Sequence, residues 1–174
     1  MNQFIFNVED KNVDYGIKSS IQTLLKGEIP VIICIGSDLA LGDSLGPLIG
    51  EIIKTKTTNA YVYGTLKNPI TAKEVDLITK NVKLLHPNSK ILVIDAAVGK
   101  KEDVGLIKVN QGGIMPGLGV NKNFSVVGDV SIIGIVSQKE NALQNLSHNT
   151  RLNLVYSLAL KISSSLIKYL TGFN

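Results

Sequence analysis

The sequence predicts a three-layer α/β domain in which a largely parallel sheet lies between helices on both faces. The first observation is a pair of short apolar runs, 31–35 and 91–94, that are rich in β-branched residues, as strands buried on both faces are. The second is that segments with a helical spacing of apolar residues alternate with such runs along the chain. This alternation favours parallel strands joined by helical crossovers, which cover both faces of the sheet. The sequence leaves the order of the strands open.

Each expected element depends on its own local pattern. Helices are expected where apolar residues recur every three or four positions, and strands where they form short runs bounded by turn formers. Residues 1–15 are mixed and turn-rich, so no regular element is expected there. Residues 111–121 contain four glycines and Pro116 and predict a shaped loop. In chain order the expected elements are a helix at 17–25, a strand at 31–35, a helix at 45–54, a strand at 60–63, a helix through 75–78, strands at 91–94, 104–109 and 130–136, and a helix at 152–170.

Composition narrows the classes of function. The 174 residues (18.7 kDa) suit one domain spanning 1–174, long enough to bury a sizeable core. Cys34 is the single cysteine and the first residues lack the basic and apolar parts of a signal peptide, which predicts a cytoplasmic protein. The lysines behind the net charge of +4 are scattered, and no apolar run approaches the roughly 18 residues of a membrane span. Neither a nucleic-acid partner nor a membrane is expected, and the oligomeric state stays open, with a homo-oligomer as one option.

Two carboxylates are the strongest candidates for chemistry. Asp43 lies in the polar, glycine-bearing loop between the first buried strand and a helix, and Asp95 follows the apolar run 91–94. Parallel strands end at the same edge of a sheet, where open α/β folds place their sites, so the two side chains are expected to converge there on one water molecule. Carboxylates within hydrogen-bond reach repel each other and one pKa rises, so one group can serve as base and the other as acid.

The same residues also have plainer interpretations. Asp43 could cap the first turn of the following helix, although Gly46 stands where a capping box needs Glu or Gln. Asp95 could simply tie down the loop after its strand. The segment 42–46 formally matches a G-x-S-x-G nucleophile elbow with Ser44 as the nucleophile. Its loop also invites a phosphate-binding interpretation, but it matches neither G-x-G-x-x-G nor a Walker loop.

A further aspartate and two histidines complete the candidates. Asp38 could join the pair or replace Asp43, although in such a loop it is more often a turn former. His86 precedes a proline at a helix–strand junction and His148 lies near the start of the last helix, where surface or capping roles are expected. A divalent ion could be held by Asp38, Asp43, Asp95 and His86, but no ligand-spacing motif such as H-E-x-x-H occurs. No metal and no cofactor are expected.

Three segments carry a resemblance to a known family. CIGSDLALGDSLGPLIG, VIDAAVG and MPGLGVNK, the last followed by VGDVSIIGIV, occur in this order within residues 30–137. This part of the chain resembles the spore protease family of the YyaC type and, more distantly, the germination protease that degrades small acid-soluble spore proteins. The resemblance implies a phosphorylase/hydrolase-like α/β fold, shared with hydrogenase maturation proteases, and an acid-dependent peptidase site. The two functional aspartates of that site fall on Asp43 of GDSLGP and Asp95 of VIDA.

The chain differs from these relatives at positions that limit which of their properties we expect here. Hydrogenase maturation proteases carry an acidic residue directly after the aspartate of their first motif, where Ser44 stands here, and no counterpart of their metal-liganding histidine is found. A nickel site is therefore not expected. The chain is also shorter than the germination protease, and residues 1–16 do not resemble its self-removed leader, so autoactivation is not expected.

The resemblance and the aspartate pair together predict a sporulation-associated endopeptidase of the forespore or spore interior. Asp43 and Asp95 would share a proton and activate water against a peptide carbonyl. The expected substrate is a protein or peptide, with small acid-soluble spore proteins as candidates, and the glycine loop would line its groove. The alternatives are a non-catalytic sporulation protein that binds a partner on a protease fold, and a metal-assisted peptidase. The substrate-binding residues expected are Gly36, Ser37, Asp38, Ser44, Gly117, Gly119 and Asn121.

Overall fold

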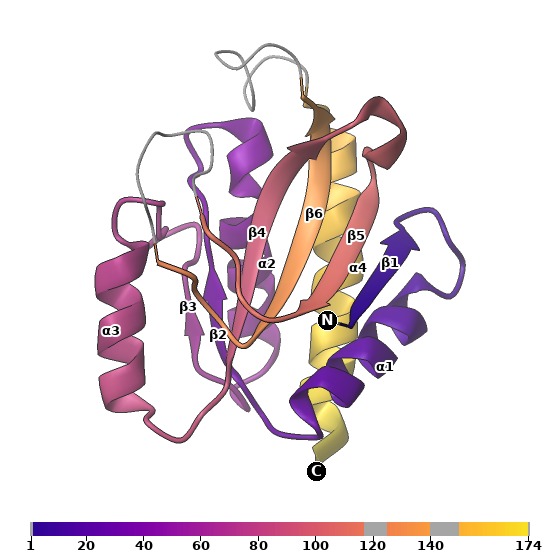
Figure 1. Cartoon of the computed structure of the whole chain (residues 1–174). Helices are drawn as coiled ribbons and strands as arrows, with labels where there is room; N and C mark the ends of the chain where they lie inside the picture. The colour runs from indigo at the N-terminus through magenta and orange to yellow at the C-terminus, as the bar shows by residue number, and fades with distance from the viewer. Residues whose placement is uncertain (1, 117–124, 140–149, 174) are drawn as a thin grey trace.

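Helices and strands alternate along most of the chain in the computed structural model, which describes residues 2–116, 125–139 and 150–173 (Figure 1). The strands are β1 (Gln3–Asn7), β2 (Val31–Cys34), β3 (Val62–Tyr63), β4 (Ile91–Gly99), β5 (Leu106–Gln111) and β6 (Val130–Gln138). The α-helices are α1 (Val13–Leu25), α2 (Leu45–Lys56), α3 (Val75–Leu85) and α4 (Leu152–Leu170). Short 3-10 helices are η1 (Leu41–Ser44), η2 (Lys101–Asp103) and η3 (Thr171–Phe173).

The strands form one mixed, mostly parallel sheet. Their order is β1-β5-β6-β4-β2-β3. The neighbours β3, β2, β4 and β6 all pair in parallel, whereas β5 pairs antiparallel with both β6 and β1. Parallel strands need helical crossovers, and the crossovers α2 and α3 connect β2 to β3 and β3 to β4. The expected α/β class with a largely parallel sheet is confirmed.

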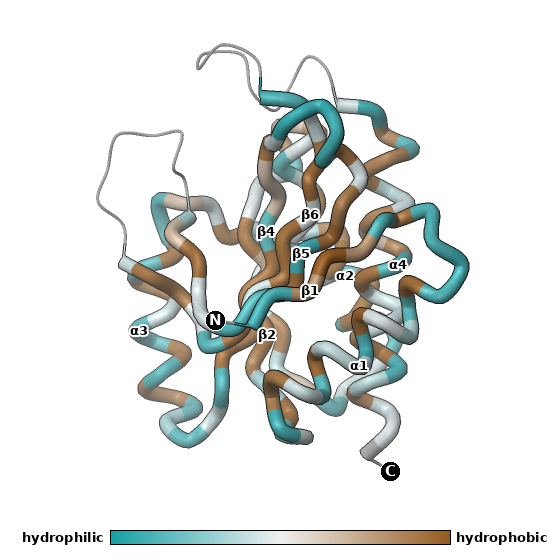
Figure 2. The backbone as a smooth tube through the Cα atoms, turned by 45° about the vertical axis from the view of Figure 1, so that its right-hand side comes forward, coloured by the Kyte–Doolittle hydropathy of each residue, from teal (hydrophilic) through white to brown (hydrophobic). Residues whose placement is uncertain are grey.

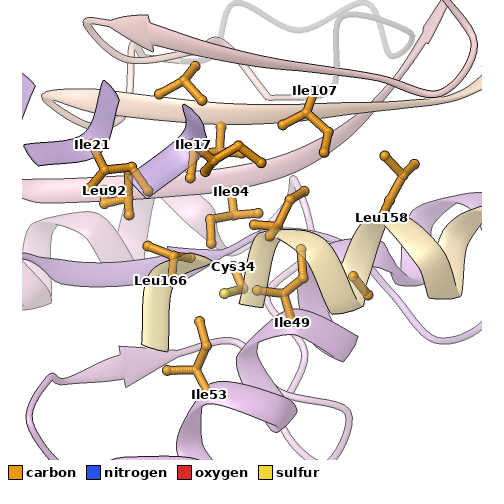
Figure 3. Close-up of a cluster of buried hydrophobic side chains, with 14 of the residues drawn as sticks. Ile17, Ile21, Cys34, Ile49, Ile53, Leu92, Ile94, Ile107, Leu158 and Leu166 are labelled. Carbon is orange, nitrogen blue, oxygen red and sulfur yellow. The ribbon is translucent and has the colours of Figure 1, made fainter. Parts of the chain in front are cut away.

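Three helices cover one face of the sheet and form the larger core. The helices α1, α2 and α4 pack there against the alternate residues of β2, β4, β5 and β6 that point to this face. Figure 3 shows Cys34 of β2 among Ile49, Ile94 and Leu166. Burial among these apolar side chains raises the pKa of the Cys34 thiol, so it is held as an unreactive neutral group.

One helix covers part of the opposite face. The residues of β2 and β4 that point away from the first core, such as Ile33 and Val93, pack against Val75 and Val82 of α3. Val127 joins this second cluster and forms an isolated bridge with Ile114, so the chain on either side of residues 117–124 also crosses this face. The sheet thus lies between two helical layers, as expected (Figure 1).

The strands β1 and β4 differ most from the sequence-based expectation, and α1 also begins earlier than expected, at Val13. The turn-rich start contains β1, an edge strand in which Phe4 and Phe6 pack toward the larger core while Gln3 and Ile5 are more exposed. Its backbone partners come from β5, about a hundred positions later in the chain, so no local turn marks it. β4 is also longer than the apolar run 91–94, because β6 continues to pair with it as far as Gly99. Within the described residues, no helix is long and apolar enough to cross a membrane.

Candidate functional site

The loop after β2 is closed by its own backbone. Gly36 has φ +139°, a conformation that L side chains rarely adopt, and its N–H donates to the Ile70 carbonyl over 2.8 Å. The Ser37 N–H donates to the backbone carbonyl of Asp43 over 3.1 Å, which joins the start of the loop to η1. A Cβ on Gly36 would lie 2.0 Å from the same carbonyl oxygen. The loop therefore holds Asp43 directly against the end of β2.

Two glycines let α2 approach the sheet closely. A Cβ on Gly46 would lie 2.0 Å from the backbone oxygen of Ile35, and one on Gly50 would lie 1.9 Å from the backbone oxygen of Gly64. No side chain could stand at either position without moving the backbone. These two residues were not among the expected site residues, although their spacing of four along a helix is the pattern that places small residues on one face. They fix the start of α2, and with it Asp43.

Asp95 lies inside a strand rather than past its end. β2 ends at Cys34, which pairs with Ile94, and the Ile35 N–H donates to the Ile94 carbonyl over 2.8 Å. β4 continues beyond this point, and Asp95 pairs with Ile133 of β6. The expectation that Asp95 follows its strand is therefore wrong for β4, but the residue lies level with the end of β2. One oxygen of its carboxyl group accepts a 2.8 Å hydrogen bond from the Ala96 N–H.

The surroundings of both aspartates disfavour the ionised form. Burial raises the pKa of Asp95 to about 8; the Ala96 amide opposes this shift, and the negative charge of Asp43 adds to it. Part of Asp95 stays accessible to water, yet protein atoms surround it closely enough for desolvation to dominate. Burial also raises the pKa of Asp43, against the effect of the Ser37 amide. The two groups are thus close enough for the charge of one to affect the proton affinity of the other.

A structural aspartate elsewhere in the chain shows the opposite behaviour. Asp14 accepts a hydrogen bond from Lys168 at 3.0 Å and lies 3.6 Å from the Lys161 ammonium. Although its burial acts in the other direction, these contacts and the Ser164 hydroxyl hold the pKa of Asp14 below its usual value. Among the described residues, no cation contributes to the pKa shift of Asp43 or Asp95. Carboxylates that are buried, uncompensated and mutually repelling are typical of functional sites rather than of ion pairs that stabilise a fold.

The remaining residues expected at the site occupy several environments. Asp38 is exposed on the loop, and the Ser37 hydroxyl accepts a hydrogen bond from the Leu39 N–H over 3.2 Å. The Ser44 hydroxyl donates to the Leu41 carbonyl over 2.7 Å, within η1. Gly36, Ser37 and Ser44 thus shape the turn that presents Asp43. Gly117, Gly119 and Asn121 lie outside the described residues.

Among the described residues, neither helix capping by Asp43 nor a nucleophilic role for Ser44 has the contacts that it would need. The N-cap position of α2 is Ser44, and no side-chain hydrogen bond caps that helix, so Asp43 is not its capping residue. A serine nucleophile would need a histidine base, but His86 follows α3 at the amino edge of the sheet, opposite the site. There the Tyr63 hydroxyl lies 3.0 Å from His86 Nε2, and the Tyr61 ring centroid lies 4.3 Å from that of His86. His148 lies outside the described residues.

The positions of these residues also decide whether they could bind a divalent ion together. A site built from Asp38, Asp43, Asp95 and His86 is not assembled, because His86 lies at the opposite edge. In the described parts of the chain, no group of three or more His, Cys, Asp or Glu side chains is placed to hold a metal. Two carboxylates alone do not supply the nitrogen or sulfur donors that nickel favours among protein ligands. The residues described here therefore do not fit a nickel centre.

Comparisons with known proteins agree with this fold. A family model described as "Protein of unknown function (DUF1256)" matches residues 5–165. The uncharacterized protein YyaC of Bacillus subtilis (strain 168) is 36% identical over 163 residues, which cover 89% of this chain and 80% of that protein. The crystal structure of a NiFe hydrogenase maturation protease, HycI from Thermococcus kodakarensis KOD1, is similar with a TM-score of 0.57 at 15% identity. The match covers 87% of this chain and 98% of HycI, and shows a protease-like, phosphorylase/hydrolase-like fold.

Proposed function

The chain belongs to the DUF1256 family, and from the environment of its two buried carboxylates we propose that it is a peptidase that hydrolyses peptide bonds with Asp43 and Asp95. The single observation that carries this proposal is the pair of raised pKa values, one partly caused by the charge of the other residue. Two carboxylates that differ in proton affinity can divide the work of acid and base. A protease-like fold supports the reaction class, although fold alone does not assign an activity.

The proposed roles follow from the two environments. With a pKa of about 8, Asp95 holds a proton at neutral pH and can donate it. Asp43, whose raised pKa is opposed by the Ser37 amide, is the group that we assign to accept a proton from water. The oxygen of that water forms the new bond to the peptide carbonyl carbon, and the C–N bond then breaks. Asp95 protonates the carbonyl oxygen as charge develops there, the proton taken up by Asp43 leaves with the amine, and Asp95 regains a proton from the tetrahedral carbon's hydroxyl group when the C=O bond of the acid product re-forms.

The biological setting is a finer part of the same proposal. The three motifs that resemble the germination protease favour a role in sporulation, in the forespore or spore interior, with small acid-soluble spore proteins as the first substrates to test.

The test compares the wild-type chain with Asp43→Asn and Asp95→Asn. Purified protein is incubated with small acid-soluble spore proteins and with a denatured protein, and fragments are identified by mass spectrometry. Each variant should lose about 10²–10⁴-fold in cleavage rate, as expected for loss of a general acid or base. Glu9→Gln, which removes one negative charge at an exposed position outside the loop, should retain the wild-type rate.

Three outcomes would contradict the proposal in different ways. Retained cleavage in either Asn variant excludes the paired-carboxylate mechanism. An intact spore protein that co-purifies with the wild-type chain indicates a non-catalytic binding protein on a protease fold. Cleavage abolished by a chelator and restored by a divalent ion indicates a metal-assisted peptidase.

A further inference from the structure

A pocket lined by lysines lies at the same edge of the sheet as the two aspartates. Its volume is about 590 Å³, and it is bounded by the end of β4, η2, and parts of β5 and β6. In Figure 2 the connection between β4 and β5 is strongly hydrophilic above the apolar strands. Ile135 provides a buried apolar side chain at the pocket. The charged residues that line it are Lys100, Lys101, Lys108, Lys139, Glu102 and Asp103.

The pocket shares one face of the sheet with Asp95. Directly paired residues of neighbouring strands point to the same face, and Asp95 pairs with Ile133, which pairs in turn with Lys108. Ile135 pairs with Ala97, two residues beyond Asp95, and so lies on this face as well. Two strand spacings separate the backbones of Asp95 and Lys108, which is about 10 Å. An extended peptide covers that distance with about three residues.

The charge of the pocket is only partly balanced. Four lysines and two acidic residues line it. The Lys108 ammonium lies 3.3 Å from a carboxylate oxygen of Asp103, so the charge of this lysine is neutralised. No other ion pair is formed between described residues of the pocket. Lys100, Lys101 and Lys139 are exposed, and none of them forms an ion pair with another described residue, so they can turn toward a ligand. Ammonium groups around an apolar floor suit a carboxylate on a short aliphatic stem, which a glutamate side chain provides.

We infer that this pocket, lined by Lys100, Lys101, Lys108 and Lys139, binds acidic side chains of a polypeptide substrate, about three residues from the bond that lies at Asp43 and Asp95. This inference rests on the proposed peptidase function, because it assigns the substrate class of the same site. The pocket selects glutamate-bearing chains and helps to hold them in register along the face that carries Asp95. Binding of the acidic chain nevertheless depends on the lysines and not on catalysis, so it can be measured separately.

A second basic pocket supplies the matched control. Lys54 and Lys56 line a pocket of about 370 Å³ at the far end of α2. Because α2 starts beside Asp43 and rises about 1.5 Å per residue, these lysines lie at the opposite edge of the sheet. Lys54→Gln/Lys56→Gln and Lys100→Gln/Lys139→Gln each remove two positive charges from the same net charge of +4. Any difference in peptide binding between the two variants is therefore caused by the position of the lysines and not by the overall charge of the protein.

The experiment measures binding by fluorescence anisotropy in the Asp43→Asn/Asp95→Asn background, in which the probe should not be cut. The probe is a labelled peptide of about ten residues with glutamate at alternate positions, and the comparison peptide carries glutamine there. At 0.05 M salt the glutamate peptide should bind at least about 5-fold more tightly than the glutamine peptide. This ratio of affinities should be smaller at 0.5 M salt, because salt screens contacts between charged groups. Lys100→Gln/Lys139→Gln should remove this preference, whereas Lys54→Gln/Lys56→Gln should keep it.

The possible contrary results distinguish failure of the pocket inference from failure of the peptidase proposal. Equal binding of the two peptides, no binding of either, or an equal loss in both lysine variants would overturn the inference. Displacement of the glutamate peptide by a lower concentration of oligothymidylate would overturn the assignment to a polypeptide. If the glutamate preference holds while the wild-type chain cuts neither peptide nor protein, the pocket assignment stands and the peptidase proposal fails.

Discussion

The loop 36–44 and strand β4 each supply one carboxylate, but they hold it in different ways. Asp43 is positioned by a turn that closes on itself and by a helix that approaches the sheet through Gly46. Asp95 is part of the hydrogen-bonded ladder between β4 and β6, and its position is fixed by strand pairing. The position of Asp43 therefore depends on the closed loop and on the start of α2, whereas the backbone position of Asp95 depends on pairing with β6. The two carboxylates of the site thus depend on different sets of contacts.

The environments of the two aspartates also affect their pKa values differently. Asp95 has the pKa that is raised to about 8, with burial as the main cause. Asp43 has its pKa raised as well, but the Ser37 amide of its own loop opposes the effect of burial. We expect perturbations of the strand residue to change stability with pH, and perturbations of the loop to change the placement of Asp43.

The largest expected effect on stability comes from Asp95→Asn. The unfolded chain loses the Asp95 proton near pH 3.8 and the folded chain near pH 8, so the wild-type protein loses stability as the pH rises between these values. The slope for this one group is at most about 1.4 kcal/mol per pH unit. Asn has no proton to lose, so the variant should gain stability relative to the wild-type chain by several kcal/mol between pH 4 and pH 8.

Urea unfolding at pH 4.5 and at pH 8 would measure this difference. Asp38→Asn is the control, because it removes a carboxylate from an exposed position of the loop. That variant should follow the wild-type chain at both pH values. If the free energy of unfolding of Asp95→Asn relative to the wild-type chain is the same at both pH values, Asp95 is not held protonated in the fold.

A smaller effect is expected from Gly46→Ala in the loop region. The new Cβ would lie 2.0 Å from the backbone oxygen of Ile35, which cannot rotate away. Alanine favours helix by up to about 1 kcal/mol over glycine, but the overlap should dominate and cost about 1–3 kcal/mol. Cleavage should fall with stability because Asp43 lies in η1, directly before the start of α2. Gly172→Ala, whose Cβ would meet only the Lys18 ammonium at 4.0 Å, should leave both unchanged.

The smallest effect is expected from Ser44→Ala. Its hydroxyl donates to the Leu41 carbonyl over 2.7 Å, so its loss should cost about 0.5–1.5 kcal/mol of stability. The cleavage rate should stay within about 3-fold of the wild-type rate once the folded fraction is corrected for, because a hydrogen bond inside η1 does not take part in proton transfer. A loss of 10²-fold or more, together with covalent labelling by a fluorophosphonate, would instead identify a serine nucleophile.

Much of this architecture follows from local sequence patterns. The buried strands 31–35 and 91–94 are recognisable because a continuous β-branched run suits a strand with both faces covered, and β2 and β4 do pair at the centre of the sheet. The amphipathic spacing of 152–170 predicts α4 over the same residues. The position of Asp43 between a strand and a helix is likewise a local property.

Other features depend on contacts that are distant in sequence. β1 alternates between Phe4 and Phe6 on one side and polar or exposed residues on the other, but it becomes a strand through pairing with β5. The small, weakly apolar residues after Asp95 look like a loop until β6 extends the ladder to Gly99. The raised pKa of Asp95 depends on burial and on Asp43, and neither can be measured along the chain.

The most direct test of the central claim, that Asp43 and Asp95 act as a coupled pair, is a titration of the carboxyl carbons by NMR. We predict that Asp95 titrates near pH 8 in the wild-type chain and Asp43 at a lower pH. In Asp43→Asn the apparent pKa of Asp95 should decrease, because the negative charge that helps to raise it has been removed. A titration of Asp95 near pH 3.8, or one that Asp43→Asn leaves unchanged, would contradict the account.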